Sequence, residues 1–258
     1  MPKLAANLSM LFNEVAFMDR FQAAADAGFK AVEYLFPYDF SAQDIRAQLH
    51  KHGLVQALFN APPGNWAAGE RGIACIPGRE EEFRSGIANA LAYSTVLGNK
   101  RLHVMAGLMP DNIDQQLATQ TYVANLRYAA QQMADAGIKV LIEPINVVDM
   151  PGYFVNYQED AAALIDEIDE PNVGLQFDFY HCQMMQGNVI STFRKLRPYV
   201  DHVQIAGVPN RHEPDKGELN YRYIFAQLEQ DGYDGFVGCE YKPAAATVDG
   251  LNWITELL

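Results

Sequence analysis

Residues 134–143 read ADAGIKVLIE, and Pro144 follows them. An alanine-rich segment of helical character runs up to Gly137, a short apolar run comes next, and the run ends at the carboxylate of Glu143. Glycine commonly terminates helices, because without a Cβ it adopts a left-handed conformation easily. The apolar run has the length and composition of a strand buried on both faces. The stretch therefore predicts a helix followed by a buried strand that ends in a carboxylate.

The same order of parts recurs along the chain. Residues 25–34 read ADAGFKAVEY, and residues 230–240 read QDGYDGFVGCE. Eight segments have strand character, and segments compatible with helices separate most neighbours. The strand candidates are 4–8, 31–35, 54–59, 101–105, 139–143, 173–178, 202–206 and 236–240, and the helix candidates are 14–27, 41–52, 79–97, 112–136, 157–169, 189–197 and 219–230.

Strands that alternate with helices predict parallel β–α units, and eight such units in 258 residues match the number and length of a closed (β/α)8 TIM barrel. A doubly wound open sheet is the alternative, although no glycine-rich turn follows the first strand candidate. No linker or composition break divides the chain, so we expect an α/β fold with a single domain over residues 1–258. Two long loops, 60–79 and 206–220, would overhang the C-terminal face of this barrel.

The chain is acidic, with a net charge of −13 and a pI near 4.8. Such a surface repels phosphate backbones and anionic lipids, so we expect neither nucleic acid nor membrane among its partners. Its three widely spaced cysteines form no disulfide framework or zinc motif, which is typical of a reducing cytosol. The first residues contain no apolar run long enough for a signal peptide or a membrane span, so the expected location is cytoplasmic.

Polar side chains stand at or near the ends of the last four strand candidates. Glu143 ends the fifth, Asp178 the sixth and Glu240 the eighth, while Gln204 lies within the seventh. Neighbouring strand ends lie side by side in a closed barrel, so the four side chains can converge on one point. Three carboxylates so close would repel one another, and a divalent cation removes that penalty. An all-oxygen site of this kind favours Mg²⁺ or Mn²⁺ over Zn²⁺.

A single glutamate at a strand end is more often solvated or salt-bridged than functional. This structural interpretation fits Glu33, because the second strand lies on the other side of the barrel from the last four. It is harder to apply to polar residues at the ends of four successive strands. We therefore prefer the metal-site interpretation for those four.

Several segments resemble the hydroxypyruvate isomerase family of xylose isomerase-like TIM barrels, a superfamily that also includes ketose 3-epimerases and the endonuclease IV group. They are LIEP (141–144), QFDFYH (176–181), HVQIAGVPNRHEPDKGELNY (202–221) and GCEYKP (238–243), and the similarity runs almost from end to end. The resemblance implies that Glu143, Asp178, Gln204 and Glu240 bind one divalent metal. In related ketose 3-epimerases a histidine takes the place of Gln204, which weakens an epimerase assignment.

The resemblance further implies an aldose–ketose type of isomerisation of a small 2-oxo acid. Hydroxypyruvate would give tartronate semialdehyde, and a 2-oxo-tetronate, one carbon longer, is an equally acceptable substrate. A proton moves between adjacent carbons through a cis-enediolate, for which the cation acts as a Lewis acid. We expect Glu143 and Glu240 to take and return this proton, in an order that the sequence leaves open.

Four more residues are candidates for contact with the substrate: His181, Arg211, His103 and Lys242. His181 matches a substrate-contacting histidine of the epimerases, and it could equally be a structural histidine at the barrel rim. Arg211 suits the carboxylate of a 2-oxo acid, because a guanidinium binds both oxygens. Its alternative role is a salt bridge with an acidic residue of its own loop, Glu213, Asp215 or Glu218.

His103 lies within the fourth strand candidate and is as compatible with a structural role as with a functional one. Trp66, in the loop 60–79, either closes over the substrate or packs the loop onto the barrel, and we favour packing.

Two other classes of function are less compatible with this sequence. A metal-dependent phosphodiesterase like endonuclease IV would need several zinc ions, many histidines and a basic surface, whereas this chain has six histidines and is acidic. A catalytically inactive barrel that only binds partners would not need the Glu143 and Glu240 pair. Relatives are often dimers or tetramers, so a homodimer or homotetramer is the assembly that the resemblance allows.

Overall fold

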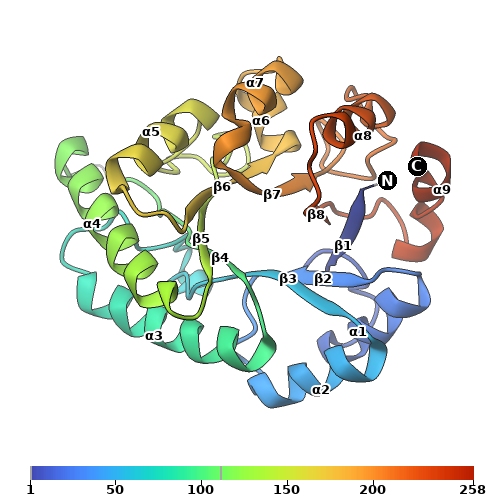
Figure 1. The fold of residues 1–258 in the computed structure, drawn as a ribbon, viewed down its shortest axis with the longest axis horizontal. Helices are drawn as coiled ribbons and strands as arrows, with labels where there is room; N and C mark the ends of the chain where they lie inside the picture. The colour runs from blue at the N-terminus through green and yellow to red at the C-terminus, as the bar shows by residue number, and fades with distance from the viewer. Residues whose placement is uncertain (1, 111) are drawn as a thin grey trace.

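The computed structural model describes residues 2–110 and 112–258. In this part of the chain, eight parallel strands form a closed barrel in sequence order, and β8 pairs with β1 (Figure 1). The predicted TIM barrel is therefore confirmed. The single domain over residues 1–258 stays a prediction, and residues 1 and 111 lie outside the described part. The strands are β1 (Lys3–Asn7), β2 (Ala31–Tyr34), β3 (Val55–Asn60), β4 (Arg101–His103), β5 (Lys139–Ile142), β6 (Val173–Asp178), β7 (Val200–Ile205) and β8 (Phe236–Cys239).

Helices surround the barrel on its outside (Figure 1). The α-helices of the described residues are α1 (Phe17–Asp26), α2 (Ala42–His52), α3 (Glu80–Leu97), α4 (Gln115–Ala134), α5 (Gln158–Ile168), α6 (Phe179–Met185), α7 (Val189–Leu196), α8 (Tyr221–Gln230) and α9 (Trp253–Leu257). Short 3₁₀ turns cover Trp66–Ala68, Arg197–Tyr199 and Thr247–Gly250. The seven predicted helices are all present, whereas α6 and α9 were not predicted.

The two ADAG repeats end their helices as predicted. Gly28 follows α1 with φ 95° and Gly137 follows α4 with φ 63°, both in the left-handed region that favours glycine. Each glycine leads within three residues into the next strand, β2 or β5. A local rule of backbone conformation is therefore enough to place these two helix–strand junctions.

Where element boundaries differ from the prediction, a specific contact explains the difference. The helix expected from residue 14 begins at Phe17, because the backbone of Ala16 is extended, and the carboxylate of Glu14 before it accepts hydrogen bonds from the backbone and hydroxyl of Thr247. The helix expected from residue 112 begins at Gln115, because Asp114 caps it by accepting the N–H groups of Gln116 and Leu117.

The strand expected over 101–105 ends at His103. Beyond it, Ala106 forms a bridge with Gly72 and accepts the N–H of Cys75, so this segment supports the long loop 60–79 instead of continuing the barrel.

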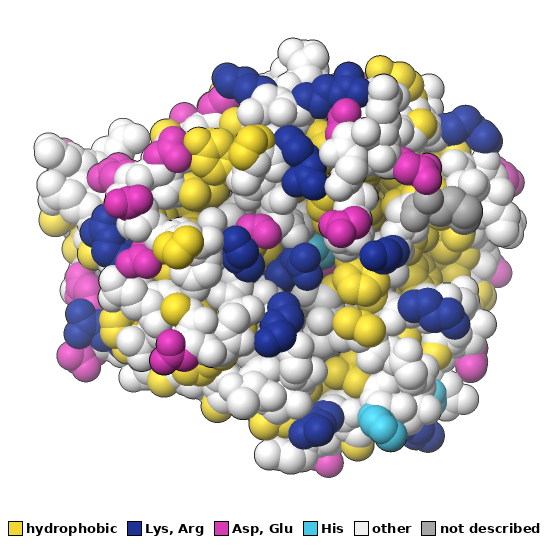
Figure 2. All heavy atoms as spheres, in the orientation of Figure 1, with side chains coloured by type: hydrophobic (Ala, Val, Ile, Leu, Met, Phe, Trp, Pro, Cys, Tyr) yellow, Lys and Arg dark blue, Asp and Glu magenta, His cyan; other side chains and the backbone are white. Residues whose placement is uncertain are grey.

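The view of Figures 1 and 2 looks onto the face at which the strands begin. Lys and Arg side chains gather around the middle of this face (Figure 2). Lys3, Arg101 and Lys139 are the first residues of three strands. Lys3 and Lys139 each donate a hydrogen bond to a backbone carbonyl of a neighbouring loop, and Arg101 donates one to the carbonyl of Asp201 at the start of β7. The carboxylates of the predicted site stand at the opposite ends of the strands. Within the described residues, no helix combines the length and the apolar character needed to cross a membrane.

Candidate active site

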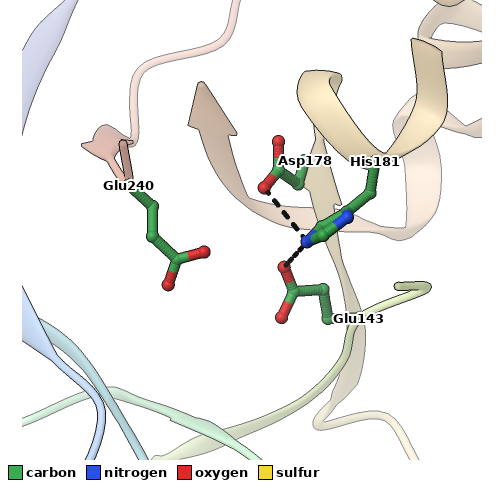
Figure 3. A group of neighbouring side chains, drawn as sticks. All are labelled: Glu143, Asp178, His181 and Glu240. Carbon is green, nitrogen blue, oxygen red and sulfur yellow. Dashed lines mark ion pairs between the residues drawn. The ribbon is translucent and has the colours of Figure 1, made fainter. Parts of the chain in front are cut away.

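Three carboxylates meet at the ends of β5, β6 and β8. Glu143 and Glu240 each follow the last residue of a strand, and Asp178 is the last residue of β6. Together with His181, in α6, they form a group whose candidate ligand atoms all lie within 4.8 Å of one another (Figure 3). All four side chains are buried. The three carboxylates therefore converge as predicted, and their chemical roles stay predictions at this point.

Helix α6 follows β6 with no loop between them, which places His181 beside the carboxylates. Asp178 caps this helix by accepting the N–H of Tyr180 on Oδ1 at 2.7 Å, so its other oxygen, Oδ2, is left to face the group. Phe, Tyr and His after a strand are not typical turn residues, and the helix was missed for that reason.

Burial and mutual repulsion shift the proton equilibria of the carboxylates. Burial raises the pKa of Glu143 well above its usual value, and repulsion from Glu240 and Asp178 adds to this. Burial also raises the pKa of Asp178 to about 6 and that of Glu240 to about 8, although Arg211 opposes both shifts. Asp178 Oδ2 and Glu143 Oε1 have no hydrogen-bond partner among the described residues. Buried carboxylate oxygens without partners are costly, and a cation would relieve that cost.

Arg211, in the loop after β7, reaches into this group. Its guanidinium forms an ion pair with Glu240 and lies 4.0 Å from Asp178 Oδ2 and 3.9 Å from Asp149 Oδ2. We had expected a substrate carboxylate, or an acidic residue of its own loop, as its partner. Fully ionised, the carboxylates of Glu143, Asp178 and Glu240 outweigh Arg211 by two charges, which a divalent cation would balance. The residues present thus fit a divalent metal.

His181 is oriented by Asn146, in the loop after β5. The ring Nδ1 lies 3.3 Å from the backbone N of Asn146 and 2.7 Å from its side-chain Nδ2. Because Asn146 Oδ1 accepts the N–H groups of Val148 and Asp149, its Nδ2 must be the end that donates to the ring. Nδ1 of His181 is therefore an acceptor and carries no proton.

The remaining nitrogen of His181 faces the carboxylates. Burial, together with the positive charge of Arg211, lowers the pKa of His181 well below its ordinary value, so the ring is neutral and its single proton is on Nε2. Nε2 lies 3.7 Å from Glu143 Oε1 and 3.7 Å from Asp178 Oδ2 (Figure 3). A nitrogen that carries a proton cannot bind a metal. His181 thus offers a hydrogen bond to the site, in line with the predicted substrate contact.

Gln204, the fourth predicted ligand, lies in β7 in register with Asp178 on one side and Gly238 on the other. Its Nε2 donates to Glu33 Oε1 at 2.8 Å, and its Oε1 accepts from Gln176 Nε2 at 2.6 Å. An amide oxygen has two lone pairs, so Oε1 keeps one for a further partner. Its fixed amide orientation is compatible with the predicted ligand role.

Glu33 was expected to be a structural residue remote from the site. It is salt-bridged, as expected, with Oε2 2.8 Å from His202 Nε2. Its position is nevertheless different from our expectation, because it is fully buried and binds Gln204 directly. Inward-facing side chains of opposite strands meet in the narrow interior of an eight-stranded barrel. Distance around the barrel wall is therefore a poor measure of separation.

The other candidates share one pocket of about 300 Å³ with Glu143 and Glu240. His103 is buried, with Nδ1 3.4 Å from Glu143 Oε2, and burial lowers its pKa to about 3, so its ring is neutral. Lys242 lines the pocket and donates its backbone N–H to the carbonyl of Arg211 at 2.7 Å. All four predicted substrate contacts, including His181 and Arg211, thus line this pocket.

Trp66 and Arg71 bring the loop 60–79 to the same pocket. The Arg71 guanidinium lies 3.9 Å from the centre of the Trp66 ring, which also contacts Phe36 with ring centroids 5.0 Å apart. Trp66 therefore packs the loop, as favoured, and also forms part of the pocket wall. Sequence reasoning missed Asn146, and also Arg71 and Asn60, which both line the pocket. Asn60 could have been predicted as a site residue, because it is a polar residue at the end of β3. Arg71 lies in a loop, where no sequence pattern marks it as part of the site.

Comparisons with known proteins cover the whole chain. The model of the xylose isomerase-like TIM barrel family matches residues 21–257. The 2-oxo-tetronate isomerase of Cupriavidus necator is 55% identical over 258 residues, with 100% of this chain and 99% of the relative covered. The hydroxypyruvate isomerase of Escherichia coli is 46% identical, with 98% of each chain covered. A crystal structure named AP endonuclease, family 2, from Brucella melitensis has a TM-score of 0.97 at 51% identity, and 99% of each chain is covered.

Proposed function

The chain belongs to the xylose isomerase-like TIM barrel family and is an isomerase, and from that premise we propose that it moves a proton between adjacent carbons of a small 2-oxo acid. The substrate would be hydroxypyruvate or a 2-oxo-tetronate, since relatives named for both acids match this chain over nearly its full length. One carbon changes binding by only about 1–3 kcal/mol in a pocket, so the two acids are alternatives within one proposal.

The observation that carries this proposal is the position of Glu143 and Glu240 on two sides of one buried group (Figure 3). Isomerisation through a cis-enediolate needs one group that removes a proton from carbon and another that returns it to the neighbouring carbon. Acid–base groups work best when their pKa lies near the working pH. The pKa of Glu240 is raised to about 8, so its carboxyl can exchange protons near neutrality, and burial also raises the pKa of Glu143.

Glu143, Asp178, Gln204 and Glu240 would hold the divalent metal, with Mg²⁺ or Mn²⁺ favoured by the all-oxygen donor set. When bound, the metal would act as a Lewis acid toward the oxygens of the substrate. Supporting observations are the unpartnered oxygens of Glu143 and Asp178 and the two uncompensated charges of the group.

The pocket of about 300 Å³ is of a size for a small acid. His181 would donate from Nε2 to an oxygen of the substrate, and His103, neutral and buried beside Glu143, would shield that carboxylate from water. Lys242 and Arg211 supply positive charge for the carboxylate of a 2-oxo acid. Arg211 already pairs with Glu240, so in this role it would share its guanidinium between enzyme and substrate.

Phosphodiester cleavage is the second candidate, because a solved structure 51% identical to this chain is named AP endonuclease. One feature of this chain speaks against it. The net charge is −13. DNA backbones require a basic surface at the site where they bind.

The test is to incubate the purified protein and Mg²⁺ or Mn²⁺ with hydroxypyruvate, a 2-oxo-tetronate and a free ketose. Aldehyde formation is followed with a coupled reductase, and uptake of solvent deuterium at carbon is followed by NMR. The proposal expects turnover and deuterium uptake with at least one of the two acids. Activity on the ketose alone would replace it by a ketose 3-epimerase, and cleavage of an abasic-site duplex would replace it by a phosphodiesterase.

The same proposal includes a homodimer or homotetramer and a cytoplasmic location. All three cysteines, Cys75, Cys182 and Cys239, are buried and free, which suits a reducing compartment.

A further inference from the structure

Beside the carboxylate group, the barrel interior contains a second set of buried polar side chains. Asn7, Glu33, His202 and Gln204 come from β1, β2 and β7, and each is at most 2% exposed. Glu33 is the member on which the others converge. Its Oε1 accepts from Gln204 Nε2 at 2.8 Å and from Asn7 Nδ2 at 3.1 Å, and its Oε2 is 2.8 Å from His202 Nε2.

Stability does not explain why this carboxylate is present. Burying a carboxylate costs free energy because the group loses its hydration, and hydrogen bonds inside the protein often do no more than offset that cost. The chain also gives up a side chain to make room for it, since a Cβ at Gly238 would collide with both carboxylate oxygens of Glu33. A glycine inside a strand weakens it, and often marks a close approach of another group. The arrangement therefore calls for a role other than holding the barrel together.

The hydrogen bonds of Glu33 lead to two of the four proposed metal ligands. Gln204 is bound directly, through the Nε2 end of its amide. Glu240 is reached through Asn7, whose Nδ2 donates both to Glu33 Oε1 and to Glu240 Oε1, at 3.1 Å each. Asn7 is itself fixed, because its Oδ1 accepts the N–H of Ser9. The amide of Gln204 is thereby held with its oxygen turned away from Glu33.

We propose that Glu33 is a positioning residue of the metal site, holding Gln204 directly and Glu240 through Asn7 in the orientations in which they bind the divalent cation. The proposal rests on the metal site of the proposed function. Groups that orient ligands from behind commonly change metal affinity by about 10- to 100-fold when they are removed. His202 in turn fixes Glu33 through its other carboxylate oxygen, Oε2.

The test measures Mn²⁺ binding to metal-free protein, by calorimetry and by the EPR signal of free Mn²⁺, so it does not depend on turnover. Glu33→Leu removes the acceptor and should weaken Mn²⁺ binding by about 10- to 100-fold. Glu33→Gln keeps an oxygen for Gln204 and Asn7, because the His202 ring can move its proton to Nδ1. This conservative variant should therefore restore most of the affinity.

Two further variants test the same hydrogen-bond connection between Glu33 and the proposed ligands while Glu33 itself is kept. Asn7→Ala cuts the link to Glu240, and Gly238→Ala pushes the Glu33 carboxylate aside without deleting a polar group. Both substitutions should weaken Mn²⁺ binding. If Glu33→Leu does not fold, these two variants still test the positioning role. Glu213→Gln is the matched control, because Glu213 is a buried carboxylate that accepts the N–H of Ala244 and contacts none of the four ligands in the described structure. Its Mn²⁺ affinity should equal that of the wild type.

The outcomes separate the two proposals. If the wild-type protein binds Mn²⁺ and the folded Glu33, Asn7 and Gly238 variants bind it equally well, the positioning role is wrong and the metal site stands. If the wild-type protein binds no divalent cation, the proposed metal site is wrong, and the proposed positioning role of Glu33 is then wrong as well. Circular dichroism and the thermal midpoint establish which variants are folded.

Discussion

Asn146 directs two N–H groups, one from its backbone and one from its side chain, at the same ring nitrogen of His181. This double donation fixes the histidine as the tautomer with its proton on Nε2, the nitrogen that faces Glu143 and Asp178. A residue outside the predicted site therefore decides whether His181 is a hydrogen-bond donor or a potential ligand.

Asn146→Ala should lower kcat/KM by about 2- to 10-fold, because the ring keeps only the backbone N–H, 3.3 Å from Nδ1, and loses the shorter hydrogen bond from the side chain. Mn²⁺ affinity should stay within a factor of about two of the wild type, since His181 is not a ligand in this account. Steady-state kinetics and metal titration on the same preparation check both statements. Loss of metal affinity equal to the loss of activity would show that His181 binds the metal.

Glu143→Gln and Glu240→Gln should each reduce turnover by about 10²- to 10⁴-fold, the usual contribution of a positioned acid or base. The amide keeps the size of the side chain but cannot take up or release the proton. The coupled assay and deuterium uptake from solvent measure the loss, with Glu213→Gln as the control. Wild-type turnover in either variant would remove that glutamate from the mechanism.

Metal-free protein should lose stability as the pH rises from 6.5 to 8. The folded-state pKa of Glu240, about 8, is above its unfolded value of about 4.3, so the folded chain keeps a proton that the unfolded chain has released. The stabilisation is complete below the unfolded pKa and is lost as the pH rises through the folded pKa. Each such carboxyl contributes a slope of at most about 1.4 kcal/mol per pH unit.

Above pH 6.5, the titration of His103 and His181 does not contribute to the change of stability with pH. The pKa values of His103 and His181 are lowered by burial, so they act with the opposite sign only below their unfolded value of about 6.5. Urea unfolding of chelator-treated protein at several pH values measures the slope. Glu240→Gln should flatten it, and saturating Mg²⁺ should abolish it, because the bound metal keeps the carboxylates ionised in the folded chain as they are in the unfolded chain. A slope unaffected by this substitution would assign the titration to other groups.

Trp66→Leu should raise KM by about 2- to 30-fold, the range that corresponds to a cation–π contact of about 0.5–2 kcal/mol. The Arg71 guanidinium, 3.9 Å from the ring centre, would lose the surface that holds it over the pocket. Trp66→Phe keeps an aromatic face and should recover most of the affinity. An unchanged KM in Trp66→Leu would limit this loop to packing.

The barrel could be predicted because its signals are local. A run such as KVLI (139–142) shows its strand character by composition, and the glycine of each ADAG repeat marks a helix end by backbone sterics alone. Helix α6 escaped prediction because it is only seven residues long and begins at Phe179, directly after the last residue of β6, with no turn residue between them. The convergence of Glu143, Asp178 and Glu240 followed from their places at strand ends, since the closure of a parallel barrel brings those ends together.

By itself, the sequence determined the order of the strands and which of them end in carboxylates, because both depend on the nearest few residues. Only the tertiary structure decided what those carboxylates face. Glu33 bonds Gln204 across 171 positions of the chain, and Asn7 bonds Glu240 across 233. Such partners are set by the radius of the closed barrel and by the direction in which each side chain crosses it. No local pattern in the sequence encodes either quantity. Glu33 was therefore predicted to be remote from the site, although its side chain points into the closed barrel and binds Gln204 there.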